Sequence, residues 1–138
     1  MSQNSKPQDS KPQISKPRDS HEVLQLLRFE LNYLEQGGFE RDKALLGTDS
    51  PFLGTFACIN YGDPLRRHAC RECGLMQFVP PDKQTEEFPC HSIRLNGSGE
   101  TIASLIEKND QRRLVTTLEH WLRATIARLE ATRSRAEK

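Results

Sequence analysis

The residues best suited to chemistry in this chain are its four cysteines, Cys58, Cys70, Cys73 and Cys90. Cys70 and Cys73 are separated by two residues, a spacing that lets two thiolates reach one metal ion from a single tight turn. The loops that lead to Cys58 and Cys90 can return to the same point at a modest entropic cost. Four thiolates around one ion form the closed tetrahedral site of structural zinc. We therefore expect one zinc ion, held by these four cysteines.

Two histidines are candidate replacements for one cysteine in this site. His68 lies two residues before Cys70, and His91 directly follows Cys90. Imidazole is a common zinc ligand, so a site of three cysteines and one histidine is the nearest variant of the prediction. Cys90 and His91 are not expected to bind one ion together, because consecutive side chains diverge.

The cysteines have other candidate uses. An iron–sulfur cluster also takes four thiolates, but cluster sequences often place three cysteines in one loop, and only two are close here. A redox pair at Cys70 and Cys73 lacks the surrounding βαβ pattern. Buried thiols without a ligand are common in protein cores. Disulfides, which four cysteines can form in three ways, are disfavoured because nothing in the sequence indicates export.

Complete catalytic motifs are absent from the sequence. The zinc deaminase signature H-x-E…P-C-x-x-C is missing, because His68 lacks its glutamate and Cys90 lacks a second cysteine. There is also no H-E-x-x-H motif and no phosphate-binding loop with its lysine. A catalytic zinc keeps an open coordination position, whereas four cysteines would fill every position. The sequence therefore favours a non-enzymatic protein.

Length and charge narrow the class of protein further. The chain has 138 residues, a formal net charge of +1 and a hydrophobic fraction of 35%, which suits one domain with a small core. The balanced charge argues against a strongly basic surface for nucleic acid. No apolar run is long enough for a membrane span, and the polar N-terminus shows no secretory signal. We expect a cytoplasmic protein without a membrane segment.

Helical patterns at the two ends of the chain must position the cysteines. Residues 1–18 repeat Ser-Lys-Pro three times with few apolar side chains, which predicts a disordered tail. Leucines then recur at helical spacing as far as Gly37, which predicts a helix over about 20–36.

A second helical segment is predicted over about 99–133. Ser98 is its expected N-cap. A break is expected at Asn109 and Asp110, where Asp110 would cap a further helix. Residues 134–138 are expected to fray.

The stretch between these helices, residues 39–98, is rich in glycine and proline and has only short apolar runs. Residues 52–59 and 75–79 are predicted as short strands or extended pieces. So long a stretch without regular structure is unusual inside a compact domain, and it contains all four cysteines. We therefore expect metal binding to supply folding free energy to residues 55–95.

These patterns predict a mainly α-helical, zinc-stapled single domain over residues 19–133. The N-terminal helix and the C-terminal helical segment pack together, and an irregular metal-binding segment lies between them. The function that fits best is a non-enzymatic adaptor, in which zinc shapes a loop surface and the helices bind a protein partner or a second copy of the chain. A nucleic-acid-binding zinc protein and an iron–sulfur or redox protein are the alternatives that use the same cysteines.

Overall fold

The computed structural model describes residues 20–52, 55, 58, 60, 65, 69–70 and 73–136, with only the backbone at Ser20 and at 134–136. Within these residues the chain is mainly helical, as predicted, and has no strand. Its α-helices and 3-10 helices follow one another in the order α1 (Ser20–Glu35), α2 (Gly38–Leu46), η3 (Gly74–Phe78), η4 (Pro81–Lys83), η5 (Pro89–Ser92), α3 (Ile102–Glu107) and α4 (Gln111–Ala136). The tail predicted over 1–18 lies outside the described residues.

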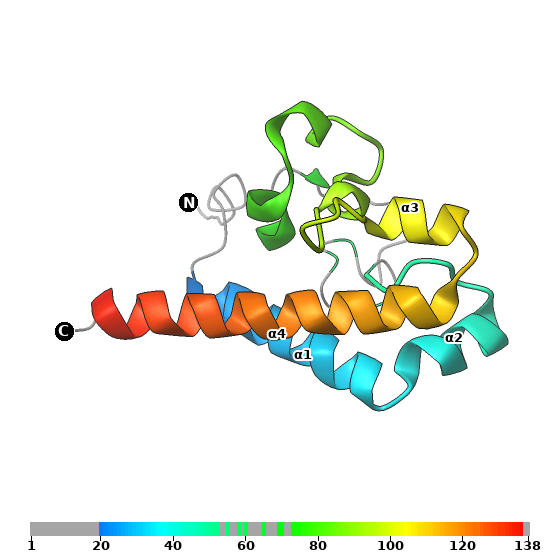
Figure 1. Cartoon of the computed structure of the whole chain (residues 1–138), viewed down its shortest axis with the longest axis horizontal. Coiled ribbons are helices and arrows are strands. Elements are labelled where there is room, and N and C mark those ends of the chain that lie inside the picture. The colour runs from blue at the N-terminus through cyan, green and yellow to red at the C-terminus, as the bar shows by residue number, and fades with distance from the viewer. Residues whose placement is uncertain are drawn as a thin grey trace, which may run out of the picture.

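Helices α1 and α4 pack side by side in opposite directions (Figure 1). Their apolar side chains belong to one core cluster. Arg28 pairs with Glu130, and Arg123 lies 2.9 Å from Glu35, so low numbers on α1 match high numbers on α4. The core contains Val23, Leu24, Leu27 and Leu34 of α1 and Leu118, Leu122 and Ile126 of α4. Each such side chain contributes about 1.5–3 kcal/mol on burial. The predicted packing of the two terminal helical segments is therefore confirmed.

Helix α2 was not expected from the sequence, because Phe39 is its single large buried side chain. Gly37 has a φ of 76° and ends α1 as predicted, but the chain resumes a helix at once. A Cβ atom at Gly38 would collide with the ring of Tyr33, so the second glycine is needed for the close approach of the two helices. The Tyr33 hydroxyl then donates a hydrogen bond to Asp42 over 2.9 Å.

The C-terminal helical segment is divided where the sequence indicated. Asn109 takes a left-handed conformation with a φ of 56°, which ends α3. The Asp110 side chain then accepts a hydrogen bond from the backbone of Arg113 at 3.1 Å and caps α4, as predicted. Helix α4 continues to Ala136, beyond the predicted end.

The predicted N-cap at Ser98 is wrong, because α3 begins later. Thr101 caps α3: its hydroxyl accepts from the backbone of Ser104, and the Ser104 hydroxyl accepts from the backbone of Thr101, both at 3.0 Å. This reciprocal pair is a capping box with serine in place of the usual glutamate.

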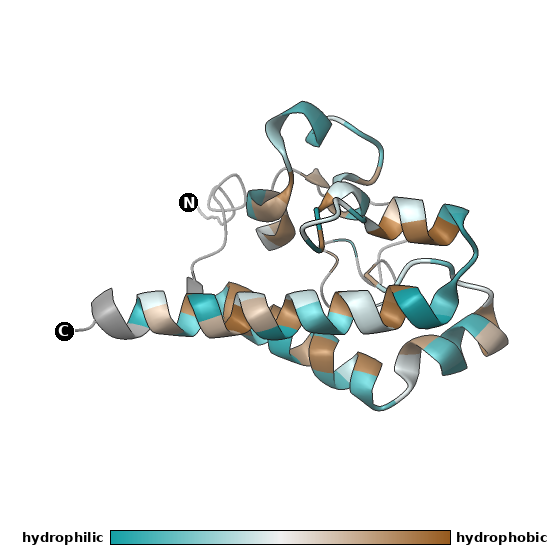
Figure 2. Cartoon of the chain, in the orientation of Figure 1, coloured by the Kyte–Doolittle hydropathy of each residue, from teal (hydrophilic) through white to brown (hydrophobic). Residues whose placement is uncertain are grey.

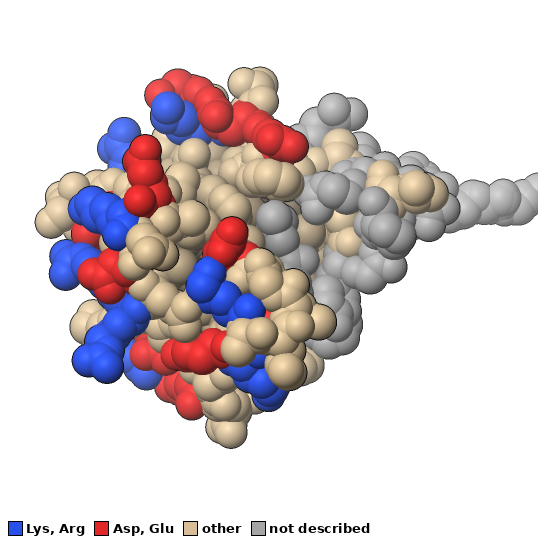
Figure 3. All heavy atoms as spheres, turned by 90° about the vertical axis from the view of Figure 1, so that its right-hand side faces the viewer, with Lys and Arg blue, Asp and Glu red and all other residues tan. Residues whose placement is uncertain are grey.

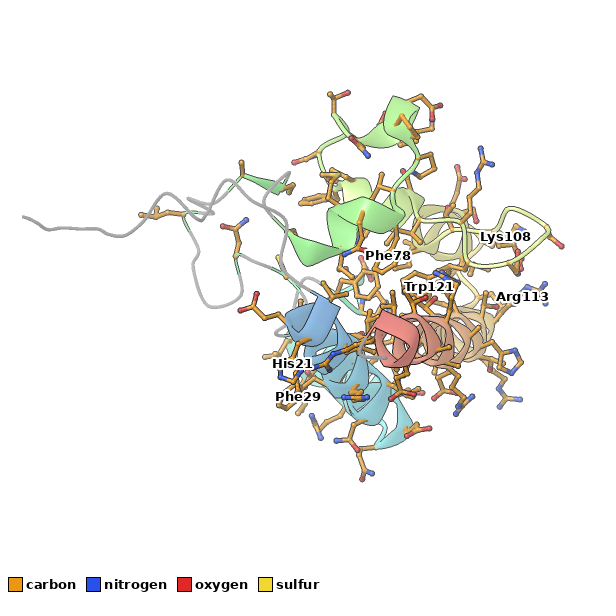
Figure 4. All side chains as sticks on the ribbon, turned by 90° about the vertical axis from the view of Figure 1, so that its left-hand side faces the viewer. His21, Phe29, Phe78, Lys108, Arg113 and Trp121 are labelled. Atoms are coloured by element: carbon orange, nitrogen blue, oxygen red, sulfur yellow. The ribbon has the colours of Figure 1, made fainter. Side chains whose placement is uncertain are left out.

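Short 3-10 helices replace the extended piece that was expected at 75–79. The prediction of an extended 75–79 is wrong, since these residues fall in η3 and at its end, where Val79 donates to the carbonyl of Met76 at 3.0 Å. Most of 52–59 lies outside the described residues. Phe78 of η3 meets Trp121 of α4 edge-on, with ring centroids 5.2 Å apart (Figure 4).

The core therefore joins the helix pair to the middle segment. Leu75, Val79 and Ile93 are buried in the same cluster as the apolar faces of α1 and α4. Apolar and polar bands alternate along α1, α3 and α4, as expected for helices that bury one face (Figure 2). Of the helices in the described part of the chain, none has the length and apolarity that a membrane crossing requires.

Candidate metal centre

The four cysteines all fall within the described residues, and each carries a thiol rather than a disulfide. Cys58 is buried, and Cys70, Cys73 and Cys90 are partly buried. They belong to three separate pieces of chain: the turn after Phe52, the turn before η3, and η5. Bringing them together therefore depends on tertiary packing rather than on local sequence.

The Cys70–Cys73 pair forms a tight turn, as its C-x-x-C spacing predicts. The backbone N–H of Cys73 donates to the carbonyl of Cys70 over 2.9 Å. Cys73 is also the N-cap of η3, and its carbonyl accepts from Met76 at 3.0 Å. The next apolar residue, Leu75, is fully buried, so core packing fixes the position of the pair.

Cys90 lies in η5, which packs against η3 directly after the C-x-x-C turn. It packs against the hydrophobic core beside Cys73. Burial raises the pKa of the Cys90 thiol well above its ordinary value. Negative charge on the other three cysteines raises this pKa further, with Cys73 first, then Cys58 and Cys70. Because Coulomb interactions weaken with distance, this effect indicates that all three lie near Cys90.

The thiols share a region without forming a finished ligand set. Among the residues that the structure describes, no group of three or more His, Cys, Asp or Glu side chains is close enough to hold a metal ion. Charge effects extend over several ångströms, whereas a Zn–S bond is about 2.3 Å. Together the two observations place the sulfur atoms in one neighbourhood, farther apart than in a ligand shell.

The donor chemistry of this neighbourhood fits a soft cation. Ionising a buried thiol beside three others is costly, because every neighbour adds charge of the same sign. A divalent cation among them reverses that relation, since each thiolate is then next to a positive charge. Four ionised thiols in this region would therefore need a cation to offset their charge.

His91, a predicted substitute ligand, is engaged elsewhere through one ring nitrogen. Its Nε2 lies 2.8 Å from the hydroxyl of Ser50, which also accepts a hydrogen bond from the backbone of Phe52. The ring stands 5.5 Å from that of Phe88, and burial lowers the pKa of His91. His91 thus links η5 to the segment after α2, and only Nδ1 is left for a metal. The other substitute, His68, lies outside the described residues.

A buried carboxyl group beside this region was missed in the sequence. Glu30 of α1 is 1% exposed, and its Oε1 lies 2.8 Å from the hydroxyl of Thr55. Burial raises the pKa of Glu30 to about 8, and the hydrogen bond from Thr55 opposes that rise. The sequence pattern could have indicated its burial, because Glu30 falls between Leu27 and Leu34 on the apolar face of the helix.

A second polar cluster stabilises the start of the C-terminal helices. Arg113 binds both carboxylate oxygens of Glu100, at 2.8 and 2.9 Å, and Asn96 donates to the same carboxylate at 2.8 Å. These contacts, Arg113 first, lower the pKa of Glu100 to about 2. The Asn96 side chain also accepts from the backbone of Ser98 and Glu100, which closes the glycine-rich turn before α3. This cluster satisfies its own charges and has the character of a structural feature.

Comparison with known protein families, with curated proteins and with solved structures finds no match to this chain. Its function is therefore inferred from its own residues and their arrangement.

Proposed function

We propose that the chain is a non-enzymatic zinc-binding protein, in which Cys58, Cys70, Cys73 and Cys90 hold one structural ion. The observation that carries the proposal is that the closed Cys70–Cys73 turn leads into η3, which packs against η5, the helix of Cys90. Chain segments far apart in sequence bring these thiols into one region. Four thiolates fill the coordination shell of zinc, so the ion has no open position for catalysis.

The role of zinc in this proposal is to order the middle of the chain. In the described residues between α2 and α3, regular structure is limited to single-turn 3-10 helices. Such turns have few backbone hydrogen bonds of their own. Metal–thiolate bonds that join the Cys58 turn, the C-x-x-C turn and η5 supply the missing cross-links.

The second part of the proposal is an adaptor function, in which the ordered domain presents apolar helix surface to a protein partner or to a second copy. The support is the exposure of Leu45 and Leu46 at the end of α2, at 74% and 78%. Two adjacent exposed leucines give a partner an apolar point of contact. Charged residues of both signs are mixed over the neighbouring face, which gives a nucleic acid no continuous basic track (Figure 3).

Elemental analysis of the purified chain, together with its mass under native conditions, tests the metal and the oligomeric state at once. We expect one zinc per chain and no visible colour. Visible absorption with stoichiometric iron would replace zinc by an iron–sulfur cluster. A chain without any stoichiometric metal would overturn the metal proposal.

Cobalt titration identifies the ligands, because tetrahedral cobalt–thiolate sites have intense visible bands. Cys58→Ser, Cys70→Ser, Cys73→Ser and Cys90→Ser should each weaken these bands. His91→Asn and His68→Asn are the matched controls and should leave them unchanged. A histidine variant that changes the bands while one cysteine variant does not would establish three cysteines and one histidine instead.

The adaptor function is tested through the α2 leucines. Leu45→Glu together with Leu46→Glu should abolish any dimer seen in native mass measurements and leave zinc content unchanged. Affinity for nucleic acid that falls steeply with salt would favour the nucleic-acid alternative.

A further inference from the structure

Helix α2 ends in an exposed run of uncharged residues, Ala44 to Gly47, which we name the α2 projection. Leu45 and Leu46 are its two large side chains, and both are mostly exposed. Leu46 follows Phe39 by seven residues, so the two lie on one face of the helix. Phe39 is fully buried, whereas Leu46 continues the same face beyond the edge of the core. The α2 projection is therefore an apolar surface that the core of its own chain does not cover.

A pocket of about 210 Å³ opens beside the α2 projection, between α2 and the turn that joins α3 to α4. These two parts of the chain lie next to each other at one end of the molecule (Figure 1). The pocket lining contains the buried apolar side chains Phe39, Leu105 and Leu114. Lys43 also lines it and lies one helical turn before Leu46. An apolar projection and an apolar pocket thus share one face of α2.

The size and lining of the pocket suit an aliphatic side chain. Sites for drug-sized ligands typically have volumes of roughly 300–1,000 Å³, and this pocket is smaller. The charged groups of its lining are already engaged: Lys43 pairs with Asp49 at 2.6 Å, and Asp110 accepts from the backbone of Arg113 at 3.1 Å. A side chain that enters the pocket therefore gains mainly apolar contact.

The charges around the pocket favour a second copy of the same surface as its occupant. Lys43 is positive, whereas Asp49 and Asp110 are negative. Charged residues of both signs are also interspersed over this end of the molecule (Figure 3). A strongly acidic peptide would meet the two aspartates, and a strongly basic one would meet the lysine. A copy related by a two-fold axis brings both signs to the contact, and each copy supplies what the other needs.

We propose that two copies of the chain associate through this face, with Leu46 of each copy inserted into the pocket of the other. The inference rests on the adaptor part of the proposed function and names a second copy as the partner. A two-fold contact of this kind uses the same surface twice, so one projection and one pocket per chain give two insertions.

Sedimentation equilibrium of the full chain over a range of concentrations tests the contact. Leu46→Ala should weaken association about tenfold or more, because it removes the inserted side chain. Gln111→Trp should weaken it similarly, because it places an indole at the edge of the pocket, which Gln111 lines. Phe29→Ala is the matched control, since it removes an exposed apolar side chain from α1, and it should leave association unchanged.

A mixture of the Leu46→Ala and Gln111→Trp chains tests the reciprocal arrangement. Each variant alone loses both insertions. A mixed pair keeps one of them, because the first variant has a free pocket and the second has an intact Leu46. The mixture should therefore associate more tightly than either variant by itself. Association that is no tighter in the mixture would overturn the reciprocal insertion.

The outcome for the parent chain separates this inference from the proposed function. A parent chain that binds zinc and stays monomeric up to about 1 mM would overturn the inference and leave the metal part standing. In such a monomer, a change in the methyl NMR signals of Leu46 on removal of residues 1–18 would identify the N-terminal segment as the occupant instead. A zinc-free chain that dimerises and responds to Leu46→Ala would support the inference and overturn only the metal part.

Discussion

The helix pair and the cysteine segment of this protein acquire their order in different ways. Helices α1 and α4 bury facing apolar stripes and form their backbone hydrogen bonds internally. In its described residues, the cysteine segment (residues 55–95) contributes a few apolar side chains such as Leu75 and Ile93 to the core and otherwise forms short turns and 3-10 helices. Apolar burial thus accounts for the order of the helix pair, whereas the cysteine segment depends in our proposal on metal–thiolate cross-links.

Loss of the metal should separate the two regions most strongly. If zinc binds as proposed, Cys73→Ser or a strong chelator should disorder the cysteine segment and retain much of the α1–α4 pair, because a structural zinc ion supplies on the order of 10 kcal/mol of folding free energy. The NMR amide spectrum, assigned by region, is the measurement. Unchanged dispersion of the amide signals of residues 55–95 after metal removal would contradict the idea that metal binding orders this segment.

A core substitution in the helix pair should give the next largest effect. Leu27 is 0% exposed, so Leu27→Ala should lower the free energy of unfolding by roughly 3 kcal/mol through lost burial and a cavity. Urea unfolding of the zinc-loaded chain measures this effect. Gln25→Ala, at an exposed position of α1, is the control and should change stability little. Equal stability of the two variants would show that α1 does not depend on the apolar interface.

Glu30 should make stability depend on pH at the boundary between the regions. Its pKa is raised from 4.5 to about 8 in the folded chain, so the folded state retains a proton that the unfolded state releases. The free energy of unfolding should therefore fall by roughly 3 kcal/mol from this group as pH rises from about 4.5 to about 7, and should continue to fall up to about pH 8. Glu30→Gln should lack this component, so the difference between variant and parent across pH isolates it from proton release by the cysteines. A difference that does not vary with pH would contradict the prediction.

Loss of the capping box of α3 should give the smallest change in stability among the four predictions. Thr101→Ala should lower stability by about 1 kcal/mol, because the backbone N–H of Ser104 loses the hydroxyl that accepts its hydrogen bond. Ser98→Ala is the control and should be neutral, since Ser98 does not cap α3. Thermal unfolding of both variants in parallel provides the comparison, and a larger loss from Ser98→Ala would restore the cap predicted from the sequence.

What could be predicted from the sequence follows the same division between regions. The leucine spacing of α1 and the Asn109–Asp110 break are local signals, and both are found in the structure. Helix α2 gave no comparable signal, because Phe39 alone connects it to the core. The η3 turn was mistaken for extended chain, since five apolar-rich residues do not distinguish a 3-10 turn from a strand.

The candidate site also has a part that local sequence predicts and a part that depends on tertiary packing. The C-x-x-C turn is encoded by its own four residues and could be predicted. The approach of Cys58 and Cys90 to that turn depends on tertiary packing, which spacing along the chain does not determine. Glu30 could have been noticed as a carboxyl on an apolar face, but its partner Thr55 is distant in sequence and offers no pattern to search for.

The edge-on contact between Phe78 and Trp121 has a practical consequence. The chain contains a single tryptophan, so all indole fluorescence originates at this one spot. Trp121 belongs to the long terminal helix, while Phe78 follows the C-x-x-C turn by a few residues. The protein therefore carries a built-in optical reporter, whose emission will register any loosening of the turn from the helix without an added dye.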